Sequence, residues 1–224
     1  MEHHADTVLY ISVIASARRA AGEVMAIVGL VLLIIWVIKP LEIPALDLSL
    51  RVLVAGLIVA SGRIHGDSRQ RLGLRLDNFG KALMHTLPVS LLAAAVCVAI
   101  GVVVRSIHPP RHPVSELLSY LAWASAQQYA LQAVVLQRLQ DAGLRGRAPL
   151  TAALLFSLVH APNPGLMVLT FLGGWFWSSI FATHPNLPAV TLSHAVLAVV
   201  AASTLPPSVI EGYQIGPSYL ARKI

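Results

Sequence analysis

The chain has 224 residues, of which 56% are hydrophobic and 12% are charged, and its mean hydropathy is +0.73. A soluble domain carries about 25% charged residues, so this composition excludes an ordinary soluble domain and indicates an integral membrane protein. The net charge of +6 does not predict nucleic-acid binding, because the basic residues cluster between apolar runs, where Lys and Arg orient membrane helices.

The N-terminal half alternates apolar runs with basic segments. Residues 7–20 are amphipathic and end in Arg18 and Arg19, so residues 1–20 are expected to form an interfacial helix. A basic interfacial segment at 63–81 precedes the cleanest apolar run of the chain. The apolar runs predict three membrane spans, at about 21–38, 45–62 and 82–104.

The C-terminal half predicts four more spans, at about 114–137, 150–160, 166–182 and 187–205. The fifth is short and breaks at Pro-Asn-Pro-Gly, residues 162–165, so a re-entrant course stays open beside a full crossing. Trp175 and Trp177 in the sixth are candidate interface anchors. Residues 206–224 contain three prolines and are expected to be an extended tail. The predicted fold class is all-α, a polytopic membrane helix bundle of about seven spans over residues 21–205 with an interfacial N-terminal helix.

The loops that share the N-terminal side carry more Lys and Arg than the loops on the opposite side. This bias predicts a cytoplasmic N-terminus, and we expect an integral protein of the bacterial inner (cell) membrane. The side of the C-terminus depends on whether the fifth run crosses fully. The single Cys97 lies in mid-span, so it forms no internal disulfide and is expected to be a packing residue.

Polar side chains inside apolar runs are the main clue to function in a membrane protein. Gln128 and Gln132 are four residues apart and share a helix face, with Gln127 one step to the side. Phe156 and His160 are also four residues apart, and the histidine ends the short fifth run. The further candidates are Asn163 and His194.

This pattern resembles the CPBP (Abi) family of intramembrane proteases, which includes the type II CAAX-processing proteases and bacteriocin self-immunity proteins. The family carries Glu-Glu-x-x-x-Arg on one membrane helix, Phe-x-x-x-His, often followed by x-x-Asn, on a later one, and a His heading a short motif on another. Phe156-Ser-Leu-Val-His160-Ala-Pro-Asn163 matches the second motif. His194 matches the third, although Ala198 stands where the family often has Asn or Asp. The resemblance covers roughly residues 70–200.

The first family motif has lost its charges, because the chain reads Gln127-Gln128-Tyr129-Ala130-Leu131-Gln132 where Glu-Glu-x-x-x-Arg is expected. In the family the first Glu is thought to activate the attacking water, and an amide has no basic site of useful strength. Replacing the two acidic residues and the arginine together keeps the site neutral and leaves no unpaired buried charge. The resemblance implies candidate catalytic residues His160, His194, Gln127 and Gln128, and candidate ligand-binding residues Gln132, Asn163 and Phe156.

Three interpretations follow. In the preferred one, the chain lacks ordinary Glu-dependent peptidase activity and binds a hydrophobic peptide, lipid or isoprenoid, or serves as an accessory subunit beside other membrane protein subunits. In the second, it is an active intramembrane endopeptidase or other membrane enzyme with His160 or His194 as general base and Gln127 and Gln128 as polarising amides. In the third, the chain is a structural membrane protein whose polar residues only form hydrogen bonds between helices. Two imidazoles without a carboxylate or thiolate make a poor zinc site, so no metal or other cofactor is expected, and the expected partners include membrane lipids but no nucleic acid.

Overall fold

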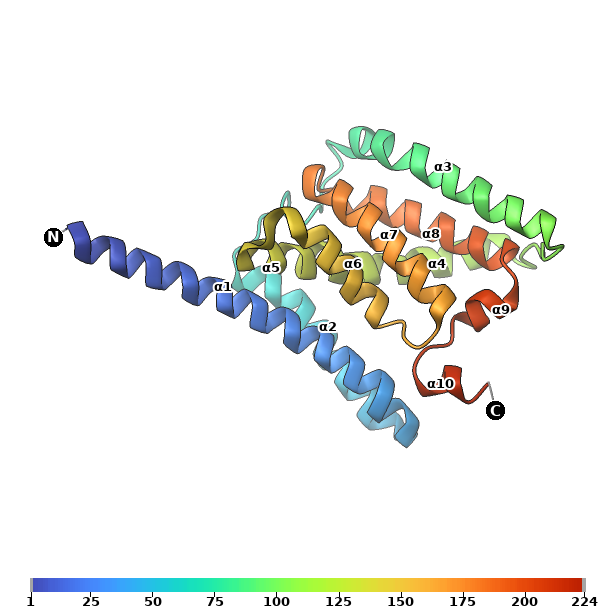
Figure 1. Cartoon of the computed structure of the whole chain (residues 1–224), viewed down its shortest axis with the longest axis horizontal. Coiled ribbons are helices and arrows are strands. Elements are labelled where there is room, and N and C mark those ends of the chain that lie inside the picture. The colour runs from blue at the N-terminus through green and yellow to red at the C-terminus, as the bar shows by residue number, and fades with distance from the viewer. Residues whose placement is uncertain (1, 223–224) are drawn as a thin grey trace.

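The structure is a computed structural model that describes residues 2–222, with side chains described from residue 14 onward except at 211. Within these residues all regular structure is helical. The helices run back and forth along one another, and the turns between them gather at two ends of the bundle (Figure 1). This confirms the predicted all-α, polytopic helical membrane bundle.

One long helix replaces the interfacial helix and first span that were predicted separately. α1 (Glu2–Leu33) passes through residues 20 and 21 without a break, and its direction continues through η1 (Ile34–Ile38) and η2 (Lys39–Leu41). The stretch Ala15-Ser-Ala-Arg-Arg-Ala-Ala21 consists mostly of strong helix formers, so nothing there ends the helix. The chain turns at Glu42, whose φ is 52°. The predicted amphipathic face over residues 7–13 lies outside the described side chains.

The remaining helices form the body of the bundle. They are α2 (Pro44–Ile64), α3 (Phe79–Val103), α4 (Pro113–Gln128), η3 (Tyr129–Leu136), α5 (Gln137–Leu139), η4 (Gln140–Leu144), η5 (Arg145–Arg147), α6 (Ala148–Leu158), α7 (Pro164–Thr183) and α8 (Leu187–Thr204). The chain stays helical from α4 to the end of η4, with two π-helical stretches, η3 and η4. Asn163 and Asn186 cap α7 and α8, because each side-chain oxygen accepts a backbone N–H of the first turn.

Five helices of the described chain are long and apolar enough to cross a membrane: Ile14–Leu41, Pro44–Ile64, Phe79–Val103, Pro164–Thr183 and Leu187–Thr204. The segments predicted as the fourth and fifth spans are not among them. α4 continues into η3 and α5 without a break, so the fourth segment is long enough, and its three glutamines lower its apolar content. α6 has only 11 residues. Eleven residues rise about 16 Å, half of a hydrocarbon core about 30 Å thick. α6 therefore does not cross a bilayer alone.

Close packing of α6 against α7 positions the middle of the bundle. A Cβ on Gly174 would lie 3.3 Å from Cα of Ala153, so the absent side chain lets the two helices approach closely. The apolar core lies where η3, α6, α7 and α8 meet, around Leu136, Phe181 and Val190. This packing leaves the polar residues of α4, α6 and α8 facing a shared interior.

The C-terminal tail is not the extended segment that was predicted for 206–224. It contains two short helices, α9 (Pro207–Ile210) and α10 (Pro217–Leu220), joined through η6 (Glu211–Tyr213). Its prolines start helical turns, where a missing N–H costs nothing. The backbone also finds partners in the bundle, since the N–H of Gly216 donates to the carbonyl of Ala161 at 2.8 Å. Residues 223–224 lie outside the described residues.

Candidate functional site

Two buried glutamines and a histidine form a hydrogen-bonded chain between α4–η3 and α8. Nε2 of Gln132 donates to Oε1 of Gln128 at 3.0 Å, and Nε2 of Gln128 lies 3.0 Å from Nδ1 of His194. Both glutamines are fully buried. Because Oε1 of Gln128 accepts the first bond, its amide nitrogen donates the second, so Nδ1 of His194 is the acceptor. The proton of this neutral imidazole is then on Nε2.

His160 has the opposite tautomer. Its Nδ1 donates to the carbonyl of Phe156 at 2.6 Å, so Nε2 carries the lone pair. The ring of Phe156 lies edge-on to both imidazoles, with centroid distances of 4.9 Å to His160 and 6.2 Å to His194. The two histidines therefore offer one acceptor nitrogen and one donor nitrogen on either side of an aromatic spacer.

Trp177 fixes the ring of His194 from the other side. The two rings stack with centroids 4.3 Å apart and an angle of 24° between their planes. Nε1 of Trp177 donates to Oγ of Ser193 at 3.0 Å, and this hydroxyl also bonds Oγ of Ser90. Trp177 is 5% exposed, so its prediction as an interface anchor is wrong, whereas Trp175 on the same helix is 49% exposed.

A polar cavity of about 310 Å³ lies beside these groups. Gln127, Phe156, His160 and His194 line it, with the tail closing one side through Tyr213 and Ile215. Burial raises the pKa of the Tyr213 phenol, which donates a hydrogen bond to the carbonyl of Ala198 at 3.0 Å. The remaining lining residues are Tyr120, Trp123, Ala124, Leu166, Thr170 and Ala198, so the described lining contains no carboxylate.

A second cavity of about 250 Å³ adjoins the polar one and is almost entirely apolar. It lies among α1, α2, α4 and α6, and its lining includes Ile27, Val31 and Ile58. Three residues line both cavities: Trp123, Gln127 and Phe156. Gln127 lies where the two cavities meet, and its amide makes no hydrogen bond with any described residue. Its N–H donors and its carbonyl acceptor are therefore available to a ligand.

The predicted site residues therefore separate into two groups. Gln127, Phe156, His160 and His194 line the polar cavity, and Gln128 orients His194 from behind. Gln132 lies behind Gln128, and its Oε1 is buried without a partner among the described residues. Gln132 does not line the polar cavity, and its role in ligand binding stays a prediction.

Asn163 bonds the backbone of α7 and of the C-terminal tail. Its Oδ1 accepts the N–H of Leu166, and its Nδ2 donates to the carbonyls of Ile210 and Gln214 at 2.9 and 3.1 Å. Both amide hydrogens are thus used by the tail, and Asn163 does not line the cavity. The residue anchors the tail that forms part of the cavity wall, and its role in ligand binding stays a prediction. Among the described residues, no group of three His, Cys, Asp or Glu side chains could hold a metal ion.

A buried charged network was missed by the sequence reasoning. Arg138 is fully buried and forms ion pairs with Asp67 and with Asp141, the latter at 2.6 Å. Arg71 bridges the same two carboxylates at 2.9 and 2.5 Å. The fourth span was predicted to end at residue 137, just before Arg138, whereas helical structure continues to Leu144. A usable signal was present in Glu23, the acidic residue of the first predicted span, which lies 3.9 Å from Arg138.

The fold and the site together define a polytopic membrane helix bundle with an uncharged polar cavity at its centre. Residues 110–200 match the family model described as type II CAAX prenyl endopeptidase Rce1-like. The match confirms the predicted resemblance to the CAAX-protease-like family and covers α4, α6, α7 and most of α8, which carry the amides and imidazoles. No curated protein and no solved structure matches the chain.

Proposed function

We propose that this CAAX-protease-like membrane protein binds an amphiphilic ligand, such as a hydrophobic peptide, a lipid or an isoprenoid, and does not carry out Glu-dependent proteolysis. One observation carries the proposal: the described lining of the polar cavity has two imidazoles and an amide but no carboxylate. The positions at which the family places its acid pair hold Gln127 and Gln128. An amide cannot take a proton from water near neutral pH, so the usual activation step lacks its base.

The two adjoining cavities suit a ligand with one polar and one apolar part. Nε2 of His160 can accept a hydrogen bond, Nε2 of His194 can donate one, and the free amide of Gln127 can do both. The apolar part would lie in the cavity lined by Ile27, Val31 and Ile58. Together the cavities have a volume within the range of ordinary small-molecule sites, about 300–1,000 Å³.

Binding can be tested on the purified chain with a diazirine-bearing farnesyl probe. We expect light-induced labelling of residues around the apolar cavity in α1, α2 and α6. Gln127→Ala should lower labelling about fivefold, since one hydrogen bond contributes roughly 1 kcal/mol. Gln70→Ala, which removes an exposed glutamine far from the cavities, is the matched control. Equal labelling of the wild type and Gln127→Ala would count against the proposal.

The proposed absence of Glu-dependent proteolysis is tested by introducing the Glu-Glu-x-x-x-Arg motif of the family. The triple variant Gln127→Glu, Gln128→Glu, Gln132→Arg has the acid pair and its balancing arginine at the positions where the family carries them. We expect no cleavage of a prenylated peptide by the wild type and measurable cleavage by the triple variant. Cleavage by the wild type that survives His160→Ala would contradict both the proposal and the alternative below.

An active enzyme with different chemistry is the second candidate, and the tautomer of His160 favours it. Its Nε2 keeps a free lone pair on a residue that lines the cavity, so it could take a proton from water. Turnover of a prenylated peptide by the wild type, lost in His160→Ala without loss of folding, would support this candidate. The accessory-subunit role, the inner-membrane location and the cytoplasmic N-terminus stay predictions, and copurification of other membrane proteins would test the first.

A further inference from the structure

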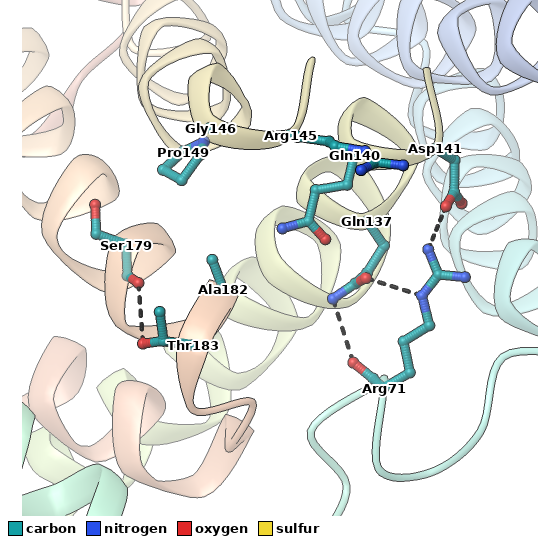
Figure 2. A pocket seen from close by; sticks show the side chains of 10 residues that line it. All are labelled: Arg71, Gln137, Gln140, Asp141, Arg145, Gly146, Pro149, Ser179, Ala182 and Thr183. Atoms are coloured by element: carbon teal, nitrogen blue, oxygen red, sulfur yellow. Dashed lines mark hydrogen bonds and ion pairs between the residues drawn. The ribbon is translucent and has the colours of Figure 1, made fainter. Parts of the chain in front are cut away.

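A third cavity, of about 580 Å³, lies away from the polar site at the end of α7, and it shares no lining residue with either cavity described above (Figure 2). It is formed by the loop after α2, the helical segment η4, the turn before α6 and the last turns of α7. The lining residues are Arg71, Gln137, Gln140, Asp141, Arg145, Gly146, Pro149, Ser179, Ala182 and Thr183. Because it lies at the ends of membrane helices, this cleft is near the membrane–water boundary.

The cleft carries one positive charge that no acid balances. Arg71 is already paired with Asp67 and Asp141 and also donates to Oε1 of Gln137 at 2.9 Å (Figure 2). Arg145 is exposed and has no ion-pair partner among the described residues. Its backbone φ is 27°, a sparsely populated conformation for a residue with a side chain, which is typical of positions held for function.

Neutral polar groups complete the cleft around Arg145. The amide of Gln140 is only partly buried and makes no hydrogen bond with a described residue. Ser179 and Thr183 of α7 lie on the wall opposite Arg71 and Gln137 (Figure 2). The guanidinium of Arg145 and the free amide of Gln140 suit an anionic phosphodiester, because arginine binds phosphate oxygens through its planar fork. The hydroxyls of Ser179 and Thr183 already donate to the carbonyls of Trp175 and Ile180, so they only form the wall.

The same face of α7 continues from this cleft as an exposed apolar stripe. Ser179 and Thr183 follow Val168, Leu172 and Trp175 at helical spacings of three and four residues, so all five share one face. The three apolar residues are 57%, 54% and 49% exposed. The face spans about 22 Å from Val168 to Thr183, which is comparable to an extended acyl chain. Trp175 lies just below the hydroxyls, the level at which aromatic residues meet the membrane interface.

We propose that this cleft binds the headgroup of an anionic phospholipid, with its phosphodiester on Arg145 and Gln140 and an acyl chain along Val168, Leu172 and Trp175. The apolar stripe favours a lipid over a free phosphate, because a soluble anion would gain nothing from it. The site goes beyond the proposed function, since it uses other residues at the opposite end of α7 from the turn that carries His160 and Asn163.

The test counts lipids bound to the full chain, purified in a neutral detergent, by native mass spectrometry. Palmitoyl-oleoyl phosphatidylglycerol is compared with the phosphatidylcholine of the same acyl chains. We expect the wild type to retain phosphatidylglycerol preferentially, and Arg145→Gln to lower its retention about fivefold, the effect of one basic residue near an anionic headgroup. Arg147→Gln removes the same charge two residues away from an exposed position outside the cleft, and it should keep the preference.

Equal losses in Arg145→Gln and Arg147→Gln would overturn the proposal, because they would indicate diffuse charge attraction. If Arg145→Gln does not fold, Gln140→Ala is the second variant: reduced retention supports the site and unchanged retention overturns it. A thermal unfolding series separates the sources of phosphate. Stabilisation by phosphatidylglycerol but not by inorganic phosphate supports a lipid site, and equal stabilisation by both overturns it.

Discussion

Gln128 donates its amide hydrogen to Nδ1 of His194 across 3.0 Å. A carboxylate in this place would accept a hydrogen bond from the imidazole, whereas the amide donates one. The amide therefore sets the neutral tautomer of His194. Four predictions follow from this and from the neighbouring contacts.

The first prediction concerns the buried amide chain. Gln128→Ala removes the partner of both Gln132 and His194 in a fully buried position, so we expect the free energy of unfolding to fall by about 1–3 kcal/mol. Gln127→Ala is the matched control, since that amide makes no hydrogen bond with a described residue, and its loss should be below about 0.5 kcal/mol. Unfolding in mixed micelles of increasing denaturing detergent measures both. Similar losses would contradict the separation of roles.

The second prediction concerns the ion pair between Arg138 and Asp67, whose side chains are both fully buried. Arg138→Met leaves Asp67 and Asp141 to share the single positive charge of Arg71, so one negative charge is left in excess and a loss of about 3–5 kcal/mol in the free energy of unfolding is expected. Adding Asp67→Leu should recover a large part of that loss. A double-mutant cycle on unfolding free energies gives the coupling, and additive losses would show that the pair does not interact.

The third prediction separates the two tasks of Asn163. Asn163→Asp keeps an oxygen that caps α7 through the N–H of Leu166 but removes the two donors to Ile210 and Gln214. Hydrogen exchange of the tail backbone should accelerate about tenfold, corresponding to roughly 1.4 kcal/mol of lost anchoring. Exchange in the first turn of α7 should stay as in the wild type. Unchanged tail exchange would show that Asn163 does not hold the tail.

The fourth prediction uses two glycines with different surroundings. Gly174→Ala places a methyl group 3.1 Å from Cδ1 of Phe156 and 3.3 Å from Cα of Ala153, so a destabilisation of about 1–3 kcal/mol is expected. Gly80→Ala in α3 meets nothing within 4 Å and should be neutral or stabilise by up to about 1 kcal/mol. Unfolding in mixed micelles compares the two variants. Equal effects would indicate that the contact between α6 and α7 is not tight at Gly174.

Apolar runs predicted five of the membrane helices, because apolar length is a local property of sequence. The motif spacing predicted that Gln128, His160 and His194 share an interior. In the structure His160 and His194 lie around the ring of Phe156, and Gln128 bonds His194.

The remaining features depend on contacts between distant segments. The sequence alone does not show that Asn163 donates its amide hydrogens to a tail about fifty residues away. It also does not show that Trp177 is buried while Trp175 is exposed. The ion-pair network of Arg138 joins the loop after α2 to α5 and η4. It was missed because the fourth helix was predicted to end at residue 137. The continuity of the first helix was missed because the basic pair Arg18-Arg19 was taken as a boundary, although arginine is a good helix former.

The short length of α6 has a consequence for how the protein enters its bilayer. A helix of 11 residues is too short to partition as an independent transmembrane unit, and its glycine-mediated contact with α7 supplies the missing support. We therefore expect the two helices to insert as one hairpin, in which the histidine at the end of α6 reaches its final depth together with α7.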